Sequence, residues 1–246
     1  GLPDGLLSVA WPSIRQTFGT PLDSLGMLLL WSSVGFTVTS FASGRILSRL
    51  STDRALLAGG ILRGLGLLGY VLSPGWPLML VAGFFNGAGS GLLDSAANTY
   101  FASHLSPRHT NWLHASFGIG STSGPLIMSG VLKLGYSWRG GFLVAGILQL
   151  VLALAYAGTR GWWNTSAPQS RQAANQDMLS ALRRPAIWLG ILLFFVYTGV
   201  EASAGQWSYT LFTQARGTPP EQARFWVSLY WGLFTLGRLL FGFIAN

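Results

Sequence analysis

The sequence predicts an all-α integral membrane protein, and two observations support this prediction. Half of the 246 residues are hydrophobic and only 9% are charged, whereas a soluble domain carries about 25% charged residues. The apolar residues form uncharged blocks, among them residues 25–44, 140–158 and 185–200. A helix of about 20 residues, rising about 1.5 Å per residue, crosses a hydrocarbon core about 30 Å thick. The lipid bilayer is therefore the expected partner of this chain.

Eight membrane segments are predicted from these blocks and from the turns between them. They cover residues 1–18, 24–46, 54–73, 76–101, 111–133, 137–158, 185–213 and 222–245. The first is expected to be cut short, since neither a Met nor a charged leader precedes it. Short turns rich in Pro, Gly and Ser separate most segments, so that consecutive helices are expected to be antiparallel neighbours.

The polar interval 159–184 is predicted to be a linker between a six-helix N-terminal bundle, residues 1–158, and a partial C-terminal bundle, residues 185–246. A short surface helix is expected near Met178. Basic loop residues favour the cytoplasmic side, and those on the linker side outnumber those opposite. On the linker side they are Arg45, Arg49, Arg54, Arg108, Arg160, Arg171, Arg183 and Arg184. The linker is therefore expected in the cytoplasm, and the chain in the plasma (inner) membrane of a bacterium.

Several classes of function are disfavoured by what the sequence contains. The net charge of +8 is scattered through loops rather than clustered, so no nucleic-acid partner is expected. There is no Cys, and neither a phosphate-binding loop, a G-x-S-x-G turn nor an H-E-x-x-H helix occurs. We expect no enzyme, no metal and no cofactor, and a monomer.

Small residues recur at four-residue spacing in two of the predicted helices. Gly83, Gly87 and Gly91 share one face, and a second such face contains Gly120 and Gly124, followed by Pro125. Such faces let helix backbones approach closely in lipid. They are expected to pack tightly, and the same smooth faces would let helices rock during transport.

Three acidic residues, Asp4, Asp94 and Glu201, fall inside apolar segments. A charge at the bilayer centre costs about 2.5–3.5 kcal/mol on insertion scales, so such residues face a bundle interior or a wet cavity. Each is therefore a candidate for coupling a proton to transport. The alternative is a static ion pair with Arg63 or Arg238.

Several polar and aromatic residues are candidates for binding a solute rich in hydroxyl groups. Asn98 lies four residues after Asp94, on the same helix face, and offers both donors and acceptors. The further candidates are His114, Gln149, Gln206, Trp207 and Trp231. The alternatives are a helix cap for His114 and a membrane-interface or lipid contact for each Trp.

Several stretches of the chain resemble the major facilitator superfamily, and within it the fucose permease-like sugar:proton symporters. The sequence 89–100, with Asp94 and Asn98, is similar to the family's helix 4. The sequence 111–125 is similar to helix 5, and Tyr197 to Glu201 to helix 7. The resemblance implies helices 1 to 8 of a twelve-helix fold, with proton coupling and sugar binding at Asp4 and Asp94.

The resemblance also covers the family's loop motif after helix 2, with departures. The matching residues are Gly44 and Arg49 in the first copy, and a second copy would begin at Gly242. Gly237 and Arg238 belong to the preceding stretch, which is similar to the family's helix 8. Ser48 and Gly83 replace charged residues that help to latch the family's outward-open state. Asp53 and Arg54 are candidates to substitute for them.

The sequence thus favours a proton-coupled symporter of a sugar or similar small polar solute, with the proton as coupling ion. Three alternatives remain open. One is a drug or metabolite efflux antiporter of the same superfamily, one is a sensor that binds solute without transporting it, and one is an intramembrane enzyme that uses an acid pair.

Overall fold

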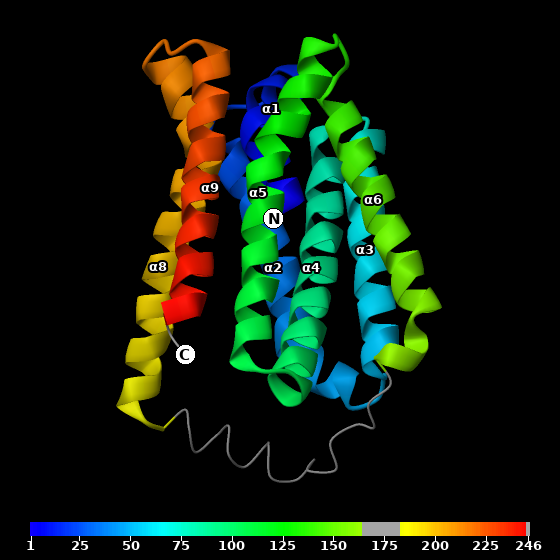
Figure 1. Cartoon of the computed structure of the whole chain (residues 1–246). Coiled ribbons are helices and arrows are strands. Elements are labelled where there is room, and N and C mark those ends of the chain that lie inside the picture. Colours follow the sequence, from blue (N-terminus) through cyan, green and yellow to red (C-terminus); the bar gives the residue numbers. More distant parts are fainter. Residues whose placement is uncertain (164–182, 245–246) are drawn as a thin grey trace.

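The computed structural model describes residues 1–163 and 183–244, except for the side chains of residues 107 and 241–244. This part of the chain consists of helices that run side by side, joined mostly by short turns (Figure 1). The elements are α1 (Leu2–Phe18), α2 (Ser24–Leu47), α3 (Thr52–Leu72), α4 (Trp76–His104), α5 (Pro107–Lys133), α6 (Trp138–Gly158), the 3₁₀ turn η1 (Arg160–Trp162), α8 (Pro185–Thr210), the π-helical turn η2 (Leu211–Ala215) and α9 (Pro220–Ile244).

A helix lies over each of the eight predicted ranges, which confirms the helical segments to within a few residues. The largest difference is α5, which begins at Pro107 rather than at 111, because Pro is well tolerated in a first helical turn. His114 therefore lies well inside the helix, and its predicted alternative role as a cap is wrong. The surface helix expected near Met178 falls outside the described residues.

Proline and glycine mark where the chain turns between helices. Pro77 and Pro185 lie in the first turns of α4 and α8, where a missing amide hydrogen costs nothing. Gly19, Gly135 and Gly217 have positive φ angles of 63°, 79° and 63°. Only glycine adopts this region readily, so these residues allow the sharp reversals after α1, after α5 and before α9.

Five of the described helices are long and apolar enough to cross a membrane, namely α2, α3, α4, α6 and α8 extended through η2. The other three long helices, α1, α5 and α9, are more polar but run alongside them (Figure 1). They also contact one another, because α5 packs against both α1 and α9. A helix that faces the interior of a bundle needs less apolar surface than one that faces lipid on most sides.

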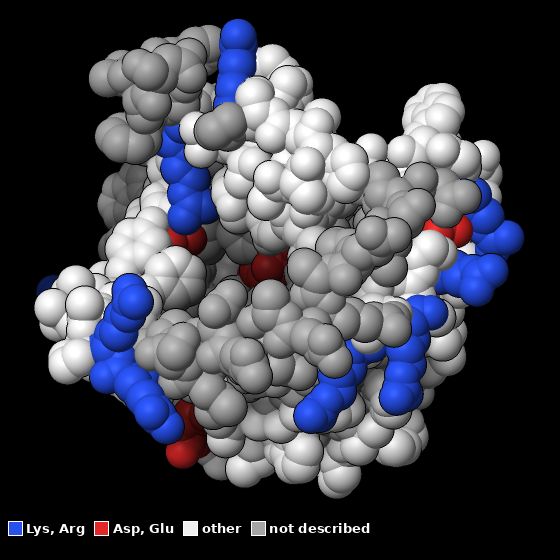
Figure 2. All heavy atoms as spheres, turned by 90° about the horizontal axis from the view of Figure 1, so that it is seen from below, with Lys and Arg blue, Asp and Glu red and all other residues white. Residues whose placement is uncertain are grey.

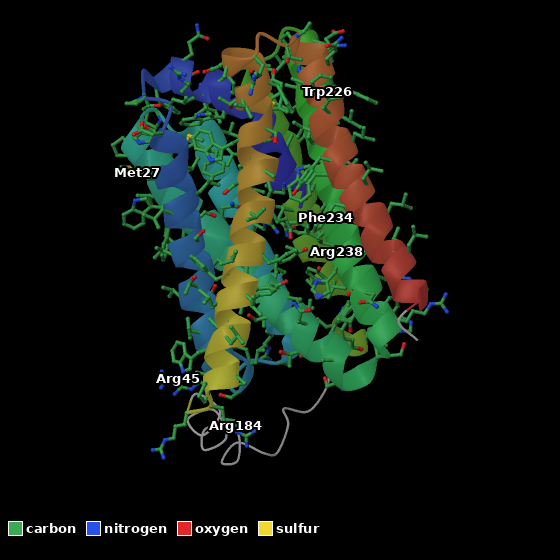
Figure 3. The ribbon with its side chains drawn as sticks, turned by 90° about the vertical axis from the view of Figure 1, so that its left-hand side faces the viewer. Met27, Arg45, Arg184, Trp226, Phe234 and Arg238 are labelled. Carbon is green, nitrogen blue, oxygen red and sulfur yellow. The ribbon has the colours of Figure 1, made fainter. Side chains whose placement is uncertain are left out.

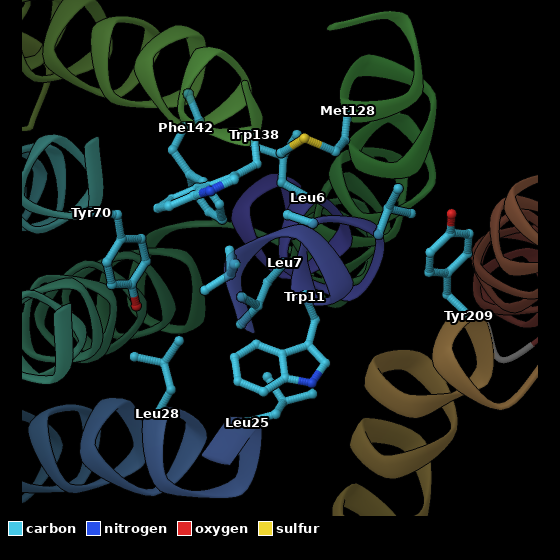
Figure 4. Packing of buried hydrophobic residues seen from close by; sticks show 14 of the residues in the cluster. Leu6, Leu7, Trp11, Leu25, Leu28, Tyr70, Met128, Trp138, Phe142 and Tyr209 are labelled. Carbon is cyan, nitrogen blue, oxygen red and sulfur yellow. The ribbon is translucent and has the colours of Figure 1, made fainter. Parts of the chain in front are cut away.

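The largest cluster of buried apolar side chains surrounds α1 (Figure 4). Leu6 and Trp11 of α1 are fully buried. Around them lie Leu25 and Leu28 of α2, Tyr70 of α3, Met128 of α5, and Trp138 and Phe142 of α6. Such dense contacts fix the position of α1 and, with it, of the acidic residue in its first turn.

The glycine faces predicted from the sequence form close helix contacts. A Cβ atom placed on Gly87 would collide with the backbone carbonyl of Ser32 in α2, and one on Gly124 would lie 2.7 Å from the backbone of Gly5 in α1. Since these spaces are filled by backbone, larger residues would force the helices apart. The predicted tight packing is confirmed at these positions.

The pair α8 and α9 touches the other helices mainly toward one end. The first half of α8 is exposed, whereas Gly205, Gln206, Tyr209 and Thr210 near its end are buried. At that end Lys133 Nζ lies 2.9 Å from Glu221 Oε1, and Arg15 donates a hydrogen bond of 3.1 Å to Gln214. These contacts join α5 to α9 and α1 to η2. Toward the linker, the first half of α8 is exposed and Gly237 of α9 has open space around it.

Candidate functional site

The face of the molecule on the linker side is hollowed. Figure 2 shows this face from below: basic side chains stand around it, and acidic atoms lie recessed toward its middle. Figure 3 shows Arg45 and Arg184 at this same end of the molecule, with Trp226 toward the other end. The arrangement places basic side chains at the mouth of the hollow and acidic side chains within it.

Asp94 is accessible, and its electrostatic neighbours come from several helices. They include Arg63 of α3, His114 of α5 and the amino group at the start of α1. These groups come from three other helices, so Asp94 lies on a side of α4 that is turned toward other helices. His114 is thus close enough to act electrostatically on Asp94, and a polar site shared by the two residues stays a prediction.

Asn98 lies one turn further along α4, on the same face as Asp94. Its Nδ2 donates a hydrogen bond of 3.0 Å to the backbone carbonyl of Asp94. This bond fixes the amide plane, while the Oδ1 atom stays available as an acceptor. A carboxylate and a carboxamide thus share one face of α4, which is chemistry suited to hydroxyl groups.

Asp4 lies in the first turn of α1, with a side chain that is 41% exposed. Its Oδ2 atom lies 3.4 Å from the amino group of Gly1. Its backbone carbonyl accepts a hydrogen bond of 3.2 Å from Gln206 Nε2 of α8. Gln206 is buried, and its Oε1 atom has no hydrogen-bond partner among the described residues. The predicted residue Gln206 therefore links α8 to the turn that carries Asp4.

Glu201 forms an ion pair with Arg238, which was the predicted alternative to a role in proton coupling. Its Oε2 lies 3.4 Å from Arg238 of α9, and the two side chains are 13% and 32% exposed. Arg238 also donates a hydrogen bond to the hydroxyl of Tyr197 and stacks over Phe234, with 4.2 Å from its guanidinium carbon to the ring centroid. In Figure 3 both Arg238 and Phe234 point away from α9 toward the other helices.

The two tryptophan candidates differ in their surroundings. Trp231 is 3% exposed, and its indole fills the space beside Gly205, where a Cβ would collide with the ring. It also packs edge-on against Phe117 of α5, with ring centroids 6.3 Å apart. Trp207 is only partly buried and packs at the edge of the main apolar cluster. Trp231 thus mainly joins α8, α9 and α5, so its ring face is not free for a solute in this arrangement.

Gln149 lies away from the acids, at the contact between α6 and α3. A Cβ on Gly60 would lie 3.6 Å from its Nε2, which has no hydrogen-bond partner among the described side chains. The sequence alone could not predict this position of Gln149. The residue lies on a mostly apolar helix, and any face of that helix could have been the one that points inward.

The loop-motif residues cluster at the linker end of the helices. Gly44 has open space around it and Arg49 is exposed. Asp53 is buried, with its Oδ2 3.9 Å from Arg160 Nε, whereas Arg54 is exposed. The Asp53–Arg160 pair joins the start of α3 to the segment after α6, within the first six helices.

In the stretch similar to the family's helix 8, Gly237 has open space around it, and Gly242, where the second copy of the loop motif would begin, lies in the last turns of α9. In the helix 5 motif, Gly120 and Gly124 face the first residues of α1, and Pro125 lies within α5 without ending it. These residues set how closely the helices approach.

Three residues of the interior were not expected from the sequence as members of a site. Tyr70, Asn86 and Ser32 line a small cavity together with Asp4. Asn86 offered one signal, because it is the only Asn within the glycine-rich first half of α4. Arg63, considered only as a possible ion-pair partner, has a buried Nε without a hydrogen-bond partner among the described residues.

The chemistry that these residues can perform is binding and proton exchange. Within residues 1–163 and 183–244 no three His, Cys, Asp or Glu residues are grouped as metal ligands. Carboxylates that face a wet hollow can gain or lose a proton as their surroundings change. Together with amide and imidazole groups, they can hold a polar solute at the same place.

Comparison with known proteins identifies a family for this chain. The family model described as Major Facilitator Superfamily matches residues 1–246. The chain is 19% identical to the glucose/mannose transporter GlcP of Bacillus subtilis over 96% of its own length and 60% of that protein.

Two further relatives match a shorter part of the chain. The 4-hydroxybenzoate transporter PcaK of Pseudomonas aeruginosa is 26% identical, over 63% of this chain and 35% of that protein. The lincomycin resistance protein of Streptomyces lincolnensis is 31% identical, over 56% of this chain and 29% of that protein. The chain thus spans at most 60% of the length of these relatives.

Proposed function

The chain belongs to the Major Facilitator Superfamily, a family of transporters rather than enzymes and multi-pass in the membrane, and on this premise we propose that it couples a proton to the symport of a sugar or a similar small polar solute. The membrane is proposed to be the plasma (inner) membrane of a bacterium, with the linker 159–184 in the cytoplasm. The coupling ion is the proton, and no other cofactor is proposed.

The observation that supports this proposal best is the environment of Asp94. Asp94 is exposed, Asn98 donates a hydrogen bond to its backbone carbonyl, and His114 and Arg63 act on its carboxyl group electrostatically. Protonation of such a group removes a charge from the interior, so it changes how strongly the neighbouring cations and amides attract a solute. The binding of a proton to Asp94 would thereby change the affinity of the same site for the solute.

Alternating access would proceed by rocking one set of helices over the other. In the present arrangement the helices meet at the Lys133–Glu221 end and are open at the linker end. With the linker in the cytoplasm, this corresponds to an inward-facing state. The outward-facing state would require the contacts of α5 with α9 and of α1 with η2 to separate.

The proposal is tested with the whole protein reconstituted in proteoliposomes. Solute entry should raise the external pH, and Asp94→Asn should abolish this proton flux while solute exchange continues. The matched control is Asp23→Asn, because Asp23 is an exposed acid in the turn before α2. Unchanged proton flux in the Asp94 variant would remove this residue from the coupling mechanism.

A second candidate is an efflux antiporter for apolar compounds, favoured by the relative named as a resistance protein and by the aromatic residues Phe117 and Phe234 around Trp231. A sugar symporter should lose at least about tenfold in solute affinity on Asn98→Ala, because buried polar groups of the solute would lose partners. An efflux antiporter for apolar compounds should be insensitive to the same substitution.

A further inference from the structure

An apolar groove lies between α3 and α4, in a part of the molecule that the proposed transport mechanism does not use. It measures about 400 Å³ and is lined by side chains from residues 62–74 and 78–85. Three of these residues are small, namely Gly66, Gly69 and Ala82. A Cβ atom placed on Gly69 would lie 2.7 Å from the Cβ of Ala82, so the two helices are in close contact there. The small residues thus leave a depression between the two helices.

The larger side chains of the groove are apolar and exposed. Leu65, Val81 and Phe85 are 56%, 50% and 44% exposed. Among the residues that line the groove, Ser73 has the only polar side chain, and its hydroxyl donates a hydrogen bond of 2.6 Å to the backbone carbonyl of Gly69. Because both helices are long and apolar enough to cross a membrane, the groove faces hydrocarbon rather than water.

The length of the groove matches one leaflet of a bilayer. Leu62 lies at the middle of α3 and Leu72 at its end, ten residues further on. At about 1.5 Å per residue they are about 15 Å apart, which is half of a hydrocarbon core about 30 Å thick. A volume of about 400 Å³ also lies in the usual range for small-molecule sites, about 300–1,000 Å³. The groove therefore has the dimensions expected for a single acyl chain.

A positive charge lies at the outer end of the groove. Arg139, at the start of α6, donates one hydrogen bond of 3.0 Å to the carbonyl of Val71 and another of 3.0 Å to the carbonyl of Ser73. A guanidinium group has five N–H donors and suits phosphate geometry. Trp76 and Tyr136 lie at the same end of the helices, as is typical of residues at the depth of lipid headgroups. An anionic headgroup is therefore the expected neighbour of Arg139.

We propose that this groove binds one phospholipid, with an acyl chain between α3 and α4 and the phosphate beside Arg139. An apolar groove of leaflet length that ends at a guanidinium group is complementary to an amphiphile with an anionic head. The site would be present whichever solute the protein transports, so it does not depend on the proposed symport.

The test uses the whole protein in phosphatidylcholine vesicles that contain a phosphatidylglycerol probe with a photoactivatable diazirine on one acyl chain. After irradiation, mass spectrometry locates the label. Residues 62–85 should be labelled at least about tenfold more than residues 191–196 of α8 at low probe content. Residues 191–196 are also apolar and exposed but do not line this groove. Labelling of the groove should saturate as the probe content rises, whereas labelling of α8 should increase in proportion.

Val81→Phe should fill part of the groove and lower its labelling at least about tenfold. The matched control is Val196→Phe, because Val196 of α8 is 54% exposed, close to the 50% of Val81. Leu65→Phe fills the groove from α3 and keeps the proposal testable if the Val81 variant does not fold.

The headgroup contact is tested with a diacylglycerol probe that carries the same acyl chain but no phosphate. In the unmodified protein, phosphatidylglycerol should label the groove more strongly than diacylglycerol. Arg139→Gln should abolish this preference, and Arg139→Lys should retain it because the positive charge remains. Equal labelling by the two probes in the unmodified protein would reject the phosphate contact.

Two results would overturn the proposal as a whole. Labelling of residues 62–85 that neither saturates nor falls in the phenylalanine variants would show only general contact with the surrounding lipid. Weak labelling of the groove together with a protein dimer, detected by chemical crosslinking in the same vesicles, would assign the groove to a second copy of this chain.

Discussion

The three acids predicted to lie within apolar segments, Asp4, Asp94 and Glu201, each have different neighbours. Asp94 is exposed one turn from Asn98, Asp4 borders a small cavity, and Glu201 is paired with Arg238 at 3.4 Å. Since the neighbours of an ionisable group decide which charge state is favoured, the three residues are not interchangeable. Of the three, Glu201 has the environment most typical of a structural ion pair.

Breaking the Glu201–Arg238 pair from one side should destabilise the protein more than removing both charges. Glu201→Gln leaves Arg238 largely without a counter-charge in a position that is only 32% exposed. Thermal unfolding of Glu201→Gln, Arg238→Gln and the double variant should give a coupling free energy of about 0.5–3 kcal/mol. Additive effects, together with loss of proton flux in Glu201→Gln alone, would instead assign Glu201 to coupling.

At the scale of the helices, glycine determines how closely the elements approach. Gly87 and Gly91 bring α4 against the backbone of α2, while Gly120 and Gly124 do the same for α5 and α1. The positions of Asp4 and Asp94 depend on these contacts, since both acids lie on helices held by them. A change of spacing there would alter the hollow without touching any polar group.

Gly87→Ala should lower the stability of the protein, because the added Cβ would collide with the backbone carbonyl of Ser32. The expected cost is about 1–3 kcal/mol, as for other overpacked interiors. Gly26→Ala is the matched control, since nothing lies within 4 Å of its Cβ position, and it should be neutral or stabilising by about 0.5–1 kcal/mol. Tryptophan fluorescence during heating measures both, and equal melting temperatures would contradict the close-contact interpretation.

At the scale of the whole molecule, the described helices meet at one end and part at the other. The closed end carries two polar contacts between the first six helices and the following ones, Lys133–Glu221 and Arg15–Gln214. Exposed ion pairs contribute about 0–1 kcal/mol. Such small free energies suit a contact that must break and re-form during transport. They stabilise the closed form of this end only slightly, so that both the inward-facing and the outward-facing state stay accessible.

Glu221→Lys should open the closed end, because it replaces an attraction to Lys133 with a repulsion. Spin labels on the exposed positions Tyr136 and Phe225, in the two sets of helices, should report longer distances. The charge-swapped double variant, Glu221→Lys with Lys133→Glu, should restore the shorter distance. Unchanged distances in the single variant would show that the ion pair does not hold this end.

The same contact should depend on pH in one direction. The hydrogen bond and positive charge of Lys133 hold the pKa of Glu221 below its ordinary value of 4.5. A lowered pKa means that the ion pair is fully present above 4.5 and is lost as the pH falls through the lowered value. The distance between the labels should therefore increase only in strongly acidic buffer, and Glu221→Gln should remove that dependence.

The sequence by itself determined the helices, their order and their tight faces, because these follow from local chemistry. Apolar blocks of membrane length, prolines in first turns and glycines at four-residue spacing act over short stretches of chain. For the same reason Asp94 and Asn98, one turn apart on α4, could be paired from their spacing alone. The proton coupling and the solute remain predictions.

Only the tertiary structure decided which distant side chains meet. Helix periodicity gives a face but not the neighbour that covers it, so it could not place Gln149 against α3 or bury the ring of Trp231 beside Gly205. Nor could it bring Ser32, Tyr70 and Asn86 around Asp4, since four helices contribute one group each. Such a cavity depends on the rotation and spacing of all four helices at once, and only the packing of the whole chain sets these.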